Sequence, residues 1–217
     1  LLLEEYALIK RFIDRVMRGT HLAVAYRERK LSGVEELLIS PDFAANFRGA
    51  EFVGLLGEDP AGRYEDYLAN LKKGVYQAVL IVGDGAIAAE DLQPDLLAAL
   101  HGCEFSAGML ADAEGGLFAA LEVVFPGRSV LEKSGLMINR NKRLQYQGQV
   151  VNYPAGSEAE WRIISRMAER NGVRLTQAAT YRDLSLEYLE SDHRVSSMDL
   201  QEIKEGGGVD LRGVWKS

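Results

Sequence analysis

Hydrophobic residues along this chain follow helical spacing in some segments and form short continuous runs in others. An apolar face near the amino terminus predicts a helix that Gly19 ends, and its members are Tyr6, Ile9, Phe12, Ile13 and Val16. Further helices are predicted over residues 61–73, 94–100, 114–120 and 182–190, and from a Ser157–Glu160 capping box to Asn171. Short apolar runs predict buried strands over residues 21–26, 76–82, 105–110 and 121–125.

Strands and helices therefore alternate through most of the chain. This order predicts an α/β fold with a doubly wound, mainly parallel sheet and helices on both faces. We assign residues 1–175 to this domain and residues 176–217 to a carboxyl-terminal extension that is partly helical or flexible. In the extension, residues 191–197 and 205–208 are expected to be mobile connections. The chain starts at Leu1 with no initiator methionine, so we expect it to be a fragment of a larger subunit.

The composition of the chain argues for a folded soluble protein and against nucleic-acid-binding and membrane-spanning proteins. The chain has 217 residues, of which 47% are hydrophobic and 26% charged, as in a folded soluble protein. A net charge of −7 opposes binding to nucleic acid, because phosphates attract a surplus of Lys and Arg. No apolar run approaches the roughly 20 residues that span a bilayer. We expect a cytoplasmic protein without a membrane span of its own.

Few residues of this chain are of the types that bind a metal or act as a nucleophile. Cys103 is the single cysteine, so the chain can form neither an internal disulfide nor an iron–sulfur site. The histidines, His21, His101 and His193, lie far apart with no second ligand at metal spacing. Motifs of common hydrolases and kinases are absent. We therefore expect no metal site and no catalytic residue in this chain.

A glycine-containing turn follows the predicted strand at residues 76–82. Gly83, Asp84 and Gly85 begin a G-x-G-x-x-A pattern, in which glycines let the backbone approach a pyrophosphate at a helix start. Pro94 follows closely, and the acidic residue that would bind a ribose is represented only by Glu104. The pattern fits either a dinucleotide-binding loop or an ordinary turn between strand and helix.

The segment from Pro126 to Gln147 is predicted to be a polar loop. Long loops in compact domains are often functional, and this one carries Glu132, Asn139 and Arg143. A structural interpretation stays open beside the functional one. In that interpretation, Glu132 and Arg143 fix the loop by a salt bridge.

The same segment resembles a known family. Val123-Val124-Phe125-Pro126, then Glu132-Lys133-Ser134-Gly135, Asn139, Arg143 and Gln145 are similar to the pattern V-V-L-P … E-K-x-G-T-x-x-N-x-x-G-R-x-Q of the molybdopterin oxidoreductases. The resemblance extends to the Trp-containing helix after Pro154, to the strand and turn at 78–85, and to the first helix at 2–18. It is most specific over residues 121–173.

Two departures separate this chain from the family's active members. Gly115, Gly116 and Leu117 stand where those members carry a T-E-T run. In the later loop, Leu136 replaces the threonine after Gly135 and Lys142 replaces the glycine before Arg143. The family uses both places to hold a pterin guanine dinucleotide. Each lost hydrogen bond to such a ligand costs about 1–3 kcal/mol.

The resemblance implies a structural or interaction region, similar to the molybdopterin-like carboxyl-terminal region of the large iron–sulfur subunit of respiratory NADH-quinone oxidoreductases (NADH dehydrogenases). It implies no cofactor in this fragment, iron–sulfur clusters only in a preceding part of the subunit, and other subunits of the complex as partners. These partners would place it peripherally on the inner face of the cell membrane. One alternative is a cofactor-binding fragment of an active, formate dehydrogenase-like enzyme that holds molybdopterin guanine dinucleotide near Glu132, Asn139 and Arg143. A second alternative is a stand-alone dinucleotide-binding domain.

Overall fold

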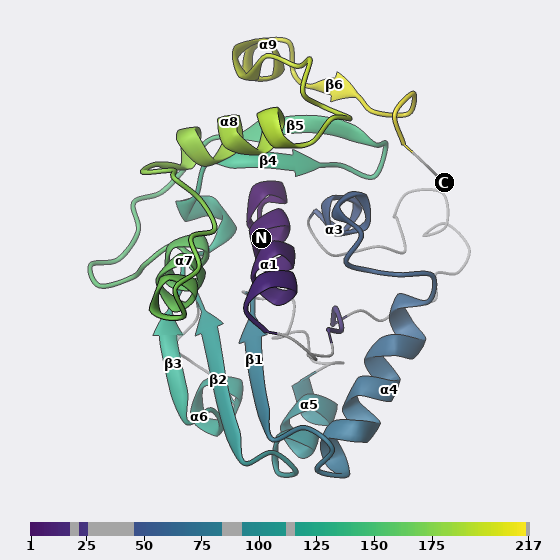
Figure 1. The fold of residues 1–217 in the computed structure, drawn as a ribbon, viewed down its shortest axis with the longest axis vertical. Helices are drawn as coiled ribbons and strands as arrows, with labels where there is room; N and C mark the ends of the chain where they lie inside the picture. Colours follow the sequence, from purple (N-terminus) through teal and green to yellow (C-terminus); the bar gives the residue numbers. More distant parts are fainter. Residues whose placement is uncertain (18–21, 26–45, 84–92, 112–115, 216–217) are drawn as a thin grey trace.

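A computed structural model of the chain describes residues 1–17, 22–25, 46–83, 93–111 and 116–215. The fold is mixed α/β, with a parallel sheet in one half and an antiparallel sheet in the other (Figure 1). The predicted α/β class, with a parallel sheet and helices on both of its faces, is confirmed. In the described residues, no helix is long and apolar enough to cross a bilayer.

The parallel sheet has the strand order β1-β2-β3, and its strands are β1 (Ala78–Val82), β2 (Phe105–Leu110) and β3 (Val123–Pro126). One face packs against α4 (Pro60–Lys72), α5 (Gln93–Leu100) and α6 (Gly116–Ala120). The other face packs against α1 (Leu3–Arg15) and α7 (Glu160–Arg170). Side chains of β1 alternate between these cores, since Val79 and Ile81 face α4 and α5, whereas Leu80 and Val82 face α1.

Two strands of the antiparallel sheet occupy residues that we predicted to be a loop. After the 3-10 turn η1 (Val130–Glu132), the chain forms the hairpin of β4 (Gly135–Ile138) and β5 (Arg143–Gln147). Leu136, Ile138 and Leu144 are fully buried, so the loop prediction for residues 126–147 was wrong. The hydrophobic effect selects the strand conformation because these side chains share one buried face.

Helix α1 lies between the two sheets, at the centre of the molecule (Figure 1). It packs against α7 on one side and α3 (Phe47–Val53) on another, and it also contacts β4 and α8 (Tyr181–Ser191). The extension continues with α9 (Leu200–Glu205) and β6 (Val209–Asp210), which pairs with β5. The core of this half therefore combines residues from both ends of the chain. A division of the chain at residue 175 stays a prediction.

Two local predictions differ from the structure. Residues 22–25 have no regular strand, although Ala23 and Ala25 contact one core cluster and Leu22 and Val24 another. The Ser157–Glu160 capping box does not form, because α7 begins at Glu160 with Ala159 as N-cap. The Ser157 hydroxyl donates instead to the Pro154 carbonyl at 2.8 Å.

Candidate functional site

A buried ionic cluster joins three segments that are far apart in the sequence. The ammonium group of Lys133 lies 2.6 Å from a carboxylate oxygen of Glu160 and 3.3 Å from one of Glu5. All three side chains are at most 1% exposed. Glu5 also accepts a hydrogen bond from the Leu2 backbone N–H at 3.0 Å, across the first turn of α1. The cluster therefore ties α1 to α7 and to the start of β4.

Glu4 is buried beside this cluster and contacts different groups. Its carboxyl group accepts hydrogen bonds from the Ser185 hydroxyl at 2.6 Å and from the Leu136 backbone N–H at 3.1 Å. Burial raises the pKa of Glu4 from 4.5 to about 8, although both hydrogen bonds lower it, and the nearby charge of Glu5 adds to the rise. At neutral pH, the Glu4 side chain therefore holds a proton that an exposed glutamate would have lost.

The pKa of the Glu160 carboxyl group is also shifted by its surroundings. Burial raises its pKa to about 7 and the charge of Glu5 contributes to this rise, while Lys133 opposes both. The Tyr181 hydroxyl of α8 lies close enough that burial, together with the charges of Glu5 and Glu160, raises its pKa well above the usual range. The ionic cluster therefore holds two carboxyl groups, of Glu5 and Glu160, beside one ammonium group, and the carboxyl group of Glu4 is buried nearby. Charge balance therefore favours a carboxyl group that stays protonated.

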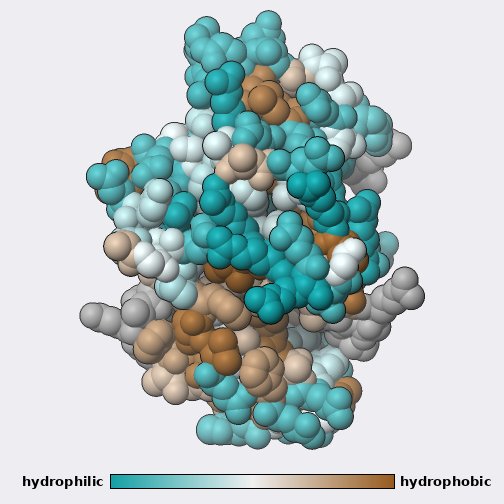
Figure 2. Space-filling model, turned by 60° about the vertical axis from the view of Figure 1, so that its left-hand side comes forward, coloured by the Kyte–Doolittle hydropathy of each residue, from teal (hydrophilic) through white to brown (hydrophobic). Residues whose placement is uncertain are grey.

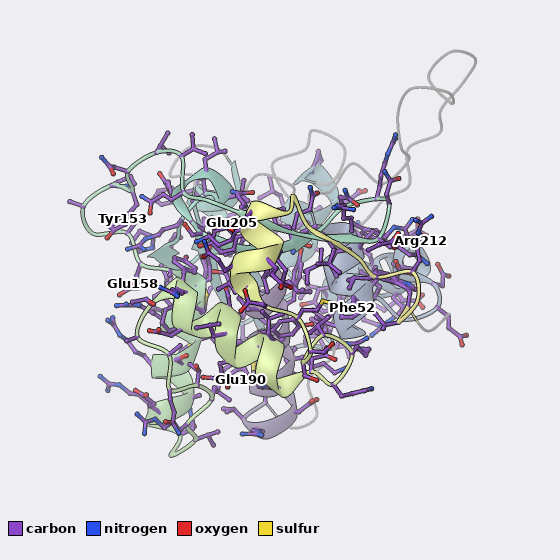
Figure 3. The ribbon with its side chains drawn as sticks, turned by 90° about the horizontal axis from the view of Figure 1, so that it is seen from above. Phe52, Tyr153, Glu158, Glu190, Glu205 and Arg212 are labelled. Atoms are coloured by element: carbon purple, nitrogen blue, oxygen red, sulfur yellow. The ribbon has the colours of Figure 1, made fainter. Side chains whose placement is uncertain are left out.

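The cluster lies at the carboxyl end of β3, which is the edge where α/β sheets usually bind ligands. The backbone N–H of Arg128, two residues after the strand, donates to Glu160 at 3.4 Å. The Arg128 guanidinium stacks 3.4 Å from the Tyr153 ring centre and lies 3.9 Å from the Glu158 carboxylate. Tyr153 and Glu158 lie on the same side of the molecule when it is viewed from above (Figure 3). The carboxyl end of β3 is therefore followed by side chains that contact one another, those of Arg128, Tyr153 and Glu158.

A second polar group lies at the turn of the β4–β5 hairpin. The Asn139 side-chain oxygen accepts from the backbone N–H groups of Asn141 at 2.9 Å and Arg143 at 3.1 Å. Its side-chain nitrogen donates to Gln145 at 3.0 Å. Asn139 therefore closes the turn, as short polar side chains commonly do.

Arg143 fixes the carboxyl-terminal segment onto this hairpin. Its guanidinium donates to the carbonyl oxygens of Gly207 at 2.9 Å and Gly208 at 2.6 Å. Gln145 reaches the Gly207 carbonyl as well, at 3.5 Å. The glycine-containing connection after α9 thus has specific contacts to two residues of the E-K-x-G … N … R-x-Q pattern.

Glu132 has a local structural contact. Its carboxylate accepts a hydrogen bond of 2.8 Å from the Ser129 backbone N–H and forms a capping box in η1. In the part of the chain that the structure describes, no Glu132–Arg143 salt bridge forms. That structural interpretation was therefore wrong, although both residues do have structural partners.

The glycine motif after β1 lies in the other half of the fold. Gly83 directly follows β1 with a φ of 150°, and its N–H donates to the Met109 carbonyl of β2 at 3.3 Å. Asp84 and Gly85 lie outside the described residues. Gly83 belongs to the parallel sheet, whereas Glu132, Asn139 and Arg143 surround the antiparallel hairpin, so the structure does not assemble the candidates into one site. No group of three metal-ligating side chains occurs within the described ranges.

Sequence analysis did not single out Glu4, Glu5 or Glu160 as members of a buried site. Acidic residues in the first turn of a helix are usually explained by the helix dipole or by solvent, not by burial. All three nevertheless lie in segments that carry the family resemblance. The family resemblance is therefore the sequence feature that could have pointed to these three glutamates.

No family model matches the chain. It is 28% identical over 130 residues to a nitrate reductase of Klebsiella oxytoca. The relationship to molybdopterin oxidoreductases is distant. The match covers 59% of this chain but 14% of the nitrate reductase, so this chain spans a small part of that relative. The match does not single out the NADH-quinone oxidoreductases.

Proposed function

We propose that this chain is a structural and interaction region of a molybdopterin oxidoreductase-like protein, of the kind found in the large iron–sulfur subunit of NADH-quinone oxidoreductase. In this proposal the chain holds no redox cofactor. One observation carries it: the polar residues of the family-like motifs bind one another and the backbone. Lys133 pairs with Glu5 and Glu160, and Arg143 binds glycine carbonyls.

The candidate pterin ligands do not fit that role in their present arrangement. A side chain that binds a buried polar ligand needs free donors or acceptors that point toward it. The carboxylate of Glu132 and the amide of Asn139 already bind groups of their own turns, and the Arg143 guanidinium binds the extension. Leu136, where the active family members carry threonine, is fully buried in the core. These contacts support a scaffold role for the motif.

A second candidate function is a cofactor-binding fragment of an active molybdopterin enzyme. The similarity to a nitrate reductase favours it, because that relative is named for a redox reaction. In this alternative, other parts of a longer protein would supply the metal ligands and most pterin contacts. The chain would then form one wall of the cofactor site.

The scaffold proposal also names partners. Subunits of a respiratory NADH dehydrogenase complex would hold the chain at the inner face of the membrane, and iron–sulfur clusters would lie in a preceding part of the same subunit. A tagged version expressed in the native host tests this association. We expect NADH:quinone oxidoreductase activity to purify with the tag after mild detergent extraction. Recovery of nitrate or formate oxidoreductase activity instead would contradict the proposal and favour the second candidate.

A further inference from the structure

The loop between β5 and α7 is exposed and uncharged. Residues 144–157 contain no charged side chain, although 26% of the chain is charged. Every residue in the range 148–156 is exposed to solvent. The large apolar side chains of this loop, together with one from η1, form what we call the apolar arm: Leu131, Val150, Val151 and Tyr153. Val150 is the most exposed of them, at 72%.

Backbone and side-chain contacts fix the base of the apolar arm. The N–H groups of Val150 and Val151 both donate to the Leu131 carbonyl, at 2.9 and 3.2 Å. The guanidinium group of Arg128 stacks on the ring of Tyr153, 3.4 Å from its centre. Because the arm is already held in place, its ordering adds little to the entropic cost of binding.

A second group of exposed apolar side chains lies around β3. We call it the apolar patch, and its members are Phe105 of β2, Phe118 of α6 and Val123 of β3. Helices α1 and α7 pack against Met109 and Phe125, nearer the carboxyl ends of these strands, and leave Phe105 and Val123 exposed. Figure 2 shows a continuous hydrophobic surface in the lower half of the molecule. Such a surface is typical of an interaction site.

The apolar arm and the apolar patch lie on the same side of the molecule. In Figure 1, the loop between β5 and α7, strand β3 and helix α6 are all on the left, with the loop above α6. Apart from Val75 and Leu186, the two groups account for the large hydrophobic side chains that are exposed in the described residues. A second copy turned by half a turn can therefore face both groups at once.

The surroundings of the apolar arm are net positive. The Glu158 carboxylate is shared by three guanidinium groups, those of Arg128 at 3.9 Å, Arg162 at 3.9 Å and Arg166 at 3.0 Å. A second carboxylate near the arm, that of Glu132, caps η1. Even with both carboxylates, the cations outnumber the anions.

The rim of the apolar patch is acidic. Glu104 and Glu122 are exposed and directly precede Phe105 and Val123 in the sequence. The Ser106 backbone N–H donates to the Glu122 carboxylate at 3.2 Å, which keeps this charge at the start of β3. The arm and the patch therefore complement each other in charge as well as in apolar surface.

We propose that this chain forms a symmetric dimer in which the apolar arm of each copy packs on the apolar patch of the other. A two-fold axis between the arm and the patch produces both contacts together, so the interface is isologous and closes after two copies. The contacts remove both apolar groups from water and bring the arginines near the arm toward Glu104 and Glu122 of the other copy. Side chains form this interface, and no strand pairing is needed. The inference does not depend on the proposed function.

Mass in solution tests the dimer itself. Light scattering after size-exclusion chromatography is expected to give the mass of two chains. Val150→Asp in the arm and Phe118→Asp in the patch are each expected to reduce it to the mass of one chain. Leu186→Asp is the matched control, because Leu186 is exposed on α8 and belongs to neither group. A single-chain mass for the unmodified protein at every concentration would overturn the proposal, and so would a dimer that both substitutions leave intact.

Mixed cross-linking tests which surfaces meet. In a Cys103→Ser background, chains with Val150→Cys are mixed with chains with Phe118→Cys and treated with a short bismaleimide cross-linker. We expect the mixed covalent dimer to form faster than the dimer of either variant alone. Faster coupling of Val150→Cys chains to one another would show an arm-to-arm contact and overturn the proposed arrangement.

Charge reversal tests the orientation of the two copies. Arg166→Glu and Glu104→Arg are each expected to weaken the dimer by about tenfold, since the reversed charge occurs in both contacts. The double variant restores opposite charges across the interface and is expected to recover the dimer affinity. A double variant that is weaker than both single variants would overturn the arm-to-patch orientation.

Discussion

The carboxyl group of Glu4 accepts a hydrogen bond of 2.6 Å from the hydroxyl group of Ser185, which joins the first helix to a helix 181 residues later. Neither side chain reaches solvent, since Glu4 is 1% and Ser185 0% exposed. The same carboxyl group binds the backbone of Leu136 in β4. One acidic side chain thus holds α1, α8 and the antiparallel sheet together.

The buried state of Glu4 predicts a pH dependence of stability. Its pKa is about 8 in the folded chain, against 4.5 when exposed, so the folded state retains a proton that the unfolded state has lost between these values. The free energy of unfolding therefore falls as pH rises through this range, by about 1.4 kcal/mol per pH unit from this group. Glu4→Gln cannot titrate, so we expect a flatter profile in urea unfolding measured from pH 5 to pH 9.

The control for this experiment is Glu65→Gln, a substitution of an exposed residue on α4. It should leave the slope of stability against pH unchanged. If Glu4→Gln and the unmodified protein have parallel profiles, Glu4 is not protonated in the folded state, and the account of this carboxyl group is wrong.

Lys133 is predicted to be the most sensitive member of the ionic cluster. Lys133→Met removes the buried ammonium group that Glu5 and Glu160 share and leaves both carboxylates without it. Removal of one partner from a buried ion pair costs about 3–5 kcal/mol. Equilibrium unfolding in urea at pH 7 measures this loss.

A double variant separates the charge effect from loss of packing. Lys133→Met together with Glu160→Leu removes both partners, so it should be more stable than Lys133→Met alone. A double variant that is less stable, by the sum of the two single effects, would show that the two residues do not interact as described.

Arg143 is predicted to fix the carboxyl-terminal segment. Arg143→Ala removes the guanidinium donors to the carbonyls of Gly207 and Gly208 and leaves the Gly207 carbonyl with only the long bond from Gln145, at a cost of about 1–3 kcal/mol. Amide hydrogen exchange should become faster in β6 and at Leu211, whose N–H donates to the Lys142 carbonyl. Arg140→Ala, in the exposed turn of the same hairpin, should leave this exchange unchanged. Equal protection in both variants would mean that the segment is held by other contacts.

Gly135 of the family-like motif is predicted to be intolerant of a side chain. A Cβ atom at this position would lie 2.2 Å from a carboxyl oxygen of Glu4 and 2.8 Å from a methyl group of Leu2. Overpacking of this kind costs about 1–3 kcal/mol. We expect Gly135→Ala to lower the thermal midpoint, whereas Gly148→Ala should have little effect, because a Cβ there meets no atom within 4 Å. Equal midpoints for the two variants would contradict the close approach of Glu4 to β4.

The parallel sheet could be predicted from sequence because its strands are short apolar runs separated by helical patterns. The antiparallel hairpin was missed, since its short apolar run Leu136-Met137-Ile138 and the single buried residue Leu144 lie among charged and amide side chains that favoured a loop. Those polar residues are satisfied by distant partners, such as the Gly207 carbonyl bound by Arg143. The local sequence pattern of the hairpin does not reveal such distant partners. Tertiary contacts therefore decided that this segment forms strands.

Candidate polar residues were also easier to find than their roles. Glu132 and Asn139 stood out because a predicted loop contained them, yet each closes a turn within a few residues of itself. Glu4 and Glu5 did not stand out, because charged residues are seldom fully buried. Their burial depends on Lys133 and Ser185, which lie 128 and 181 residues from their respective partners.

We propose that the family-like motifs of this chain build the fold and hold no cofactor. The most direct test is to release and quantify pterin by fluorescence, together with molybdenum analysis, on the protein purified from its native host. We expect pterin and molybdenum far below one equivalent per chain. Near-stoichiometric pterin would contradict this expectation, and would mean that the sequence departures at Gly115, Gly116, Leu117 and Leu136 do not prevent cofactor binding.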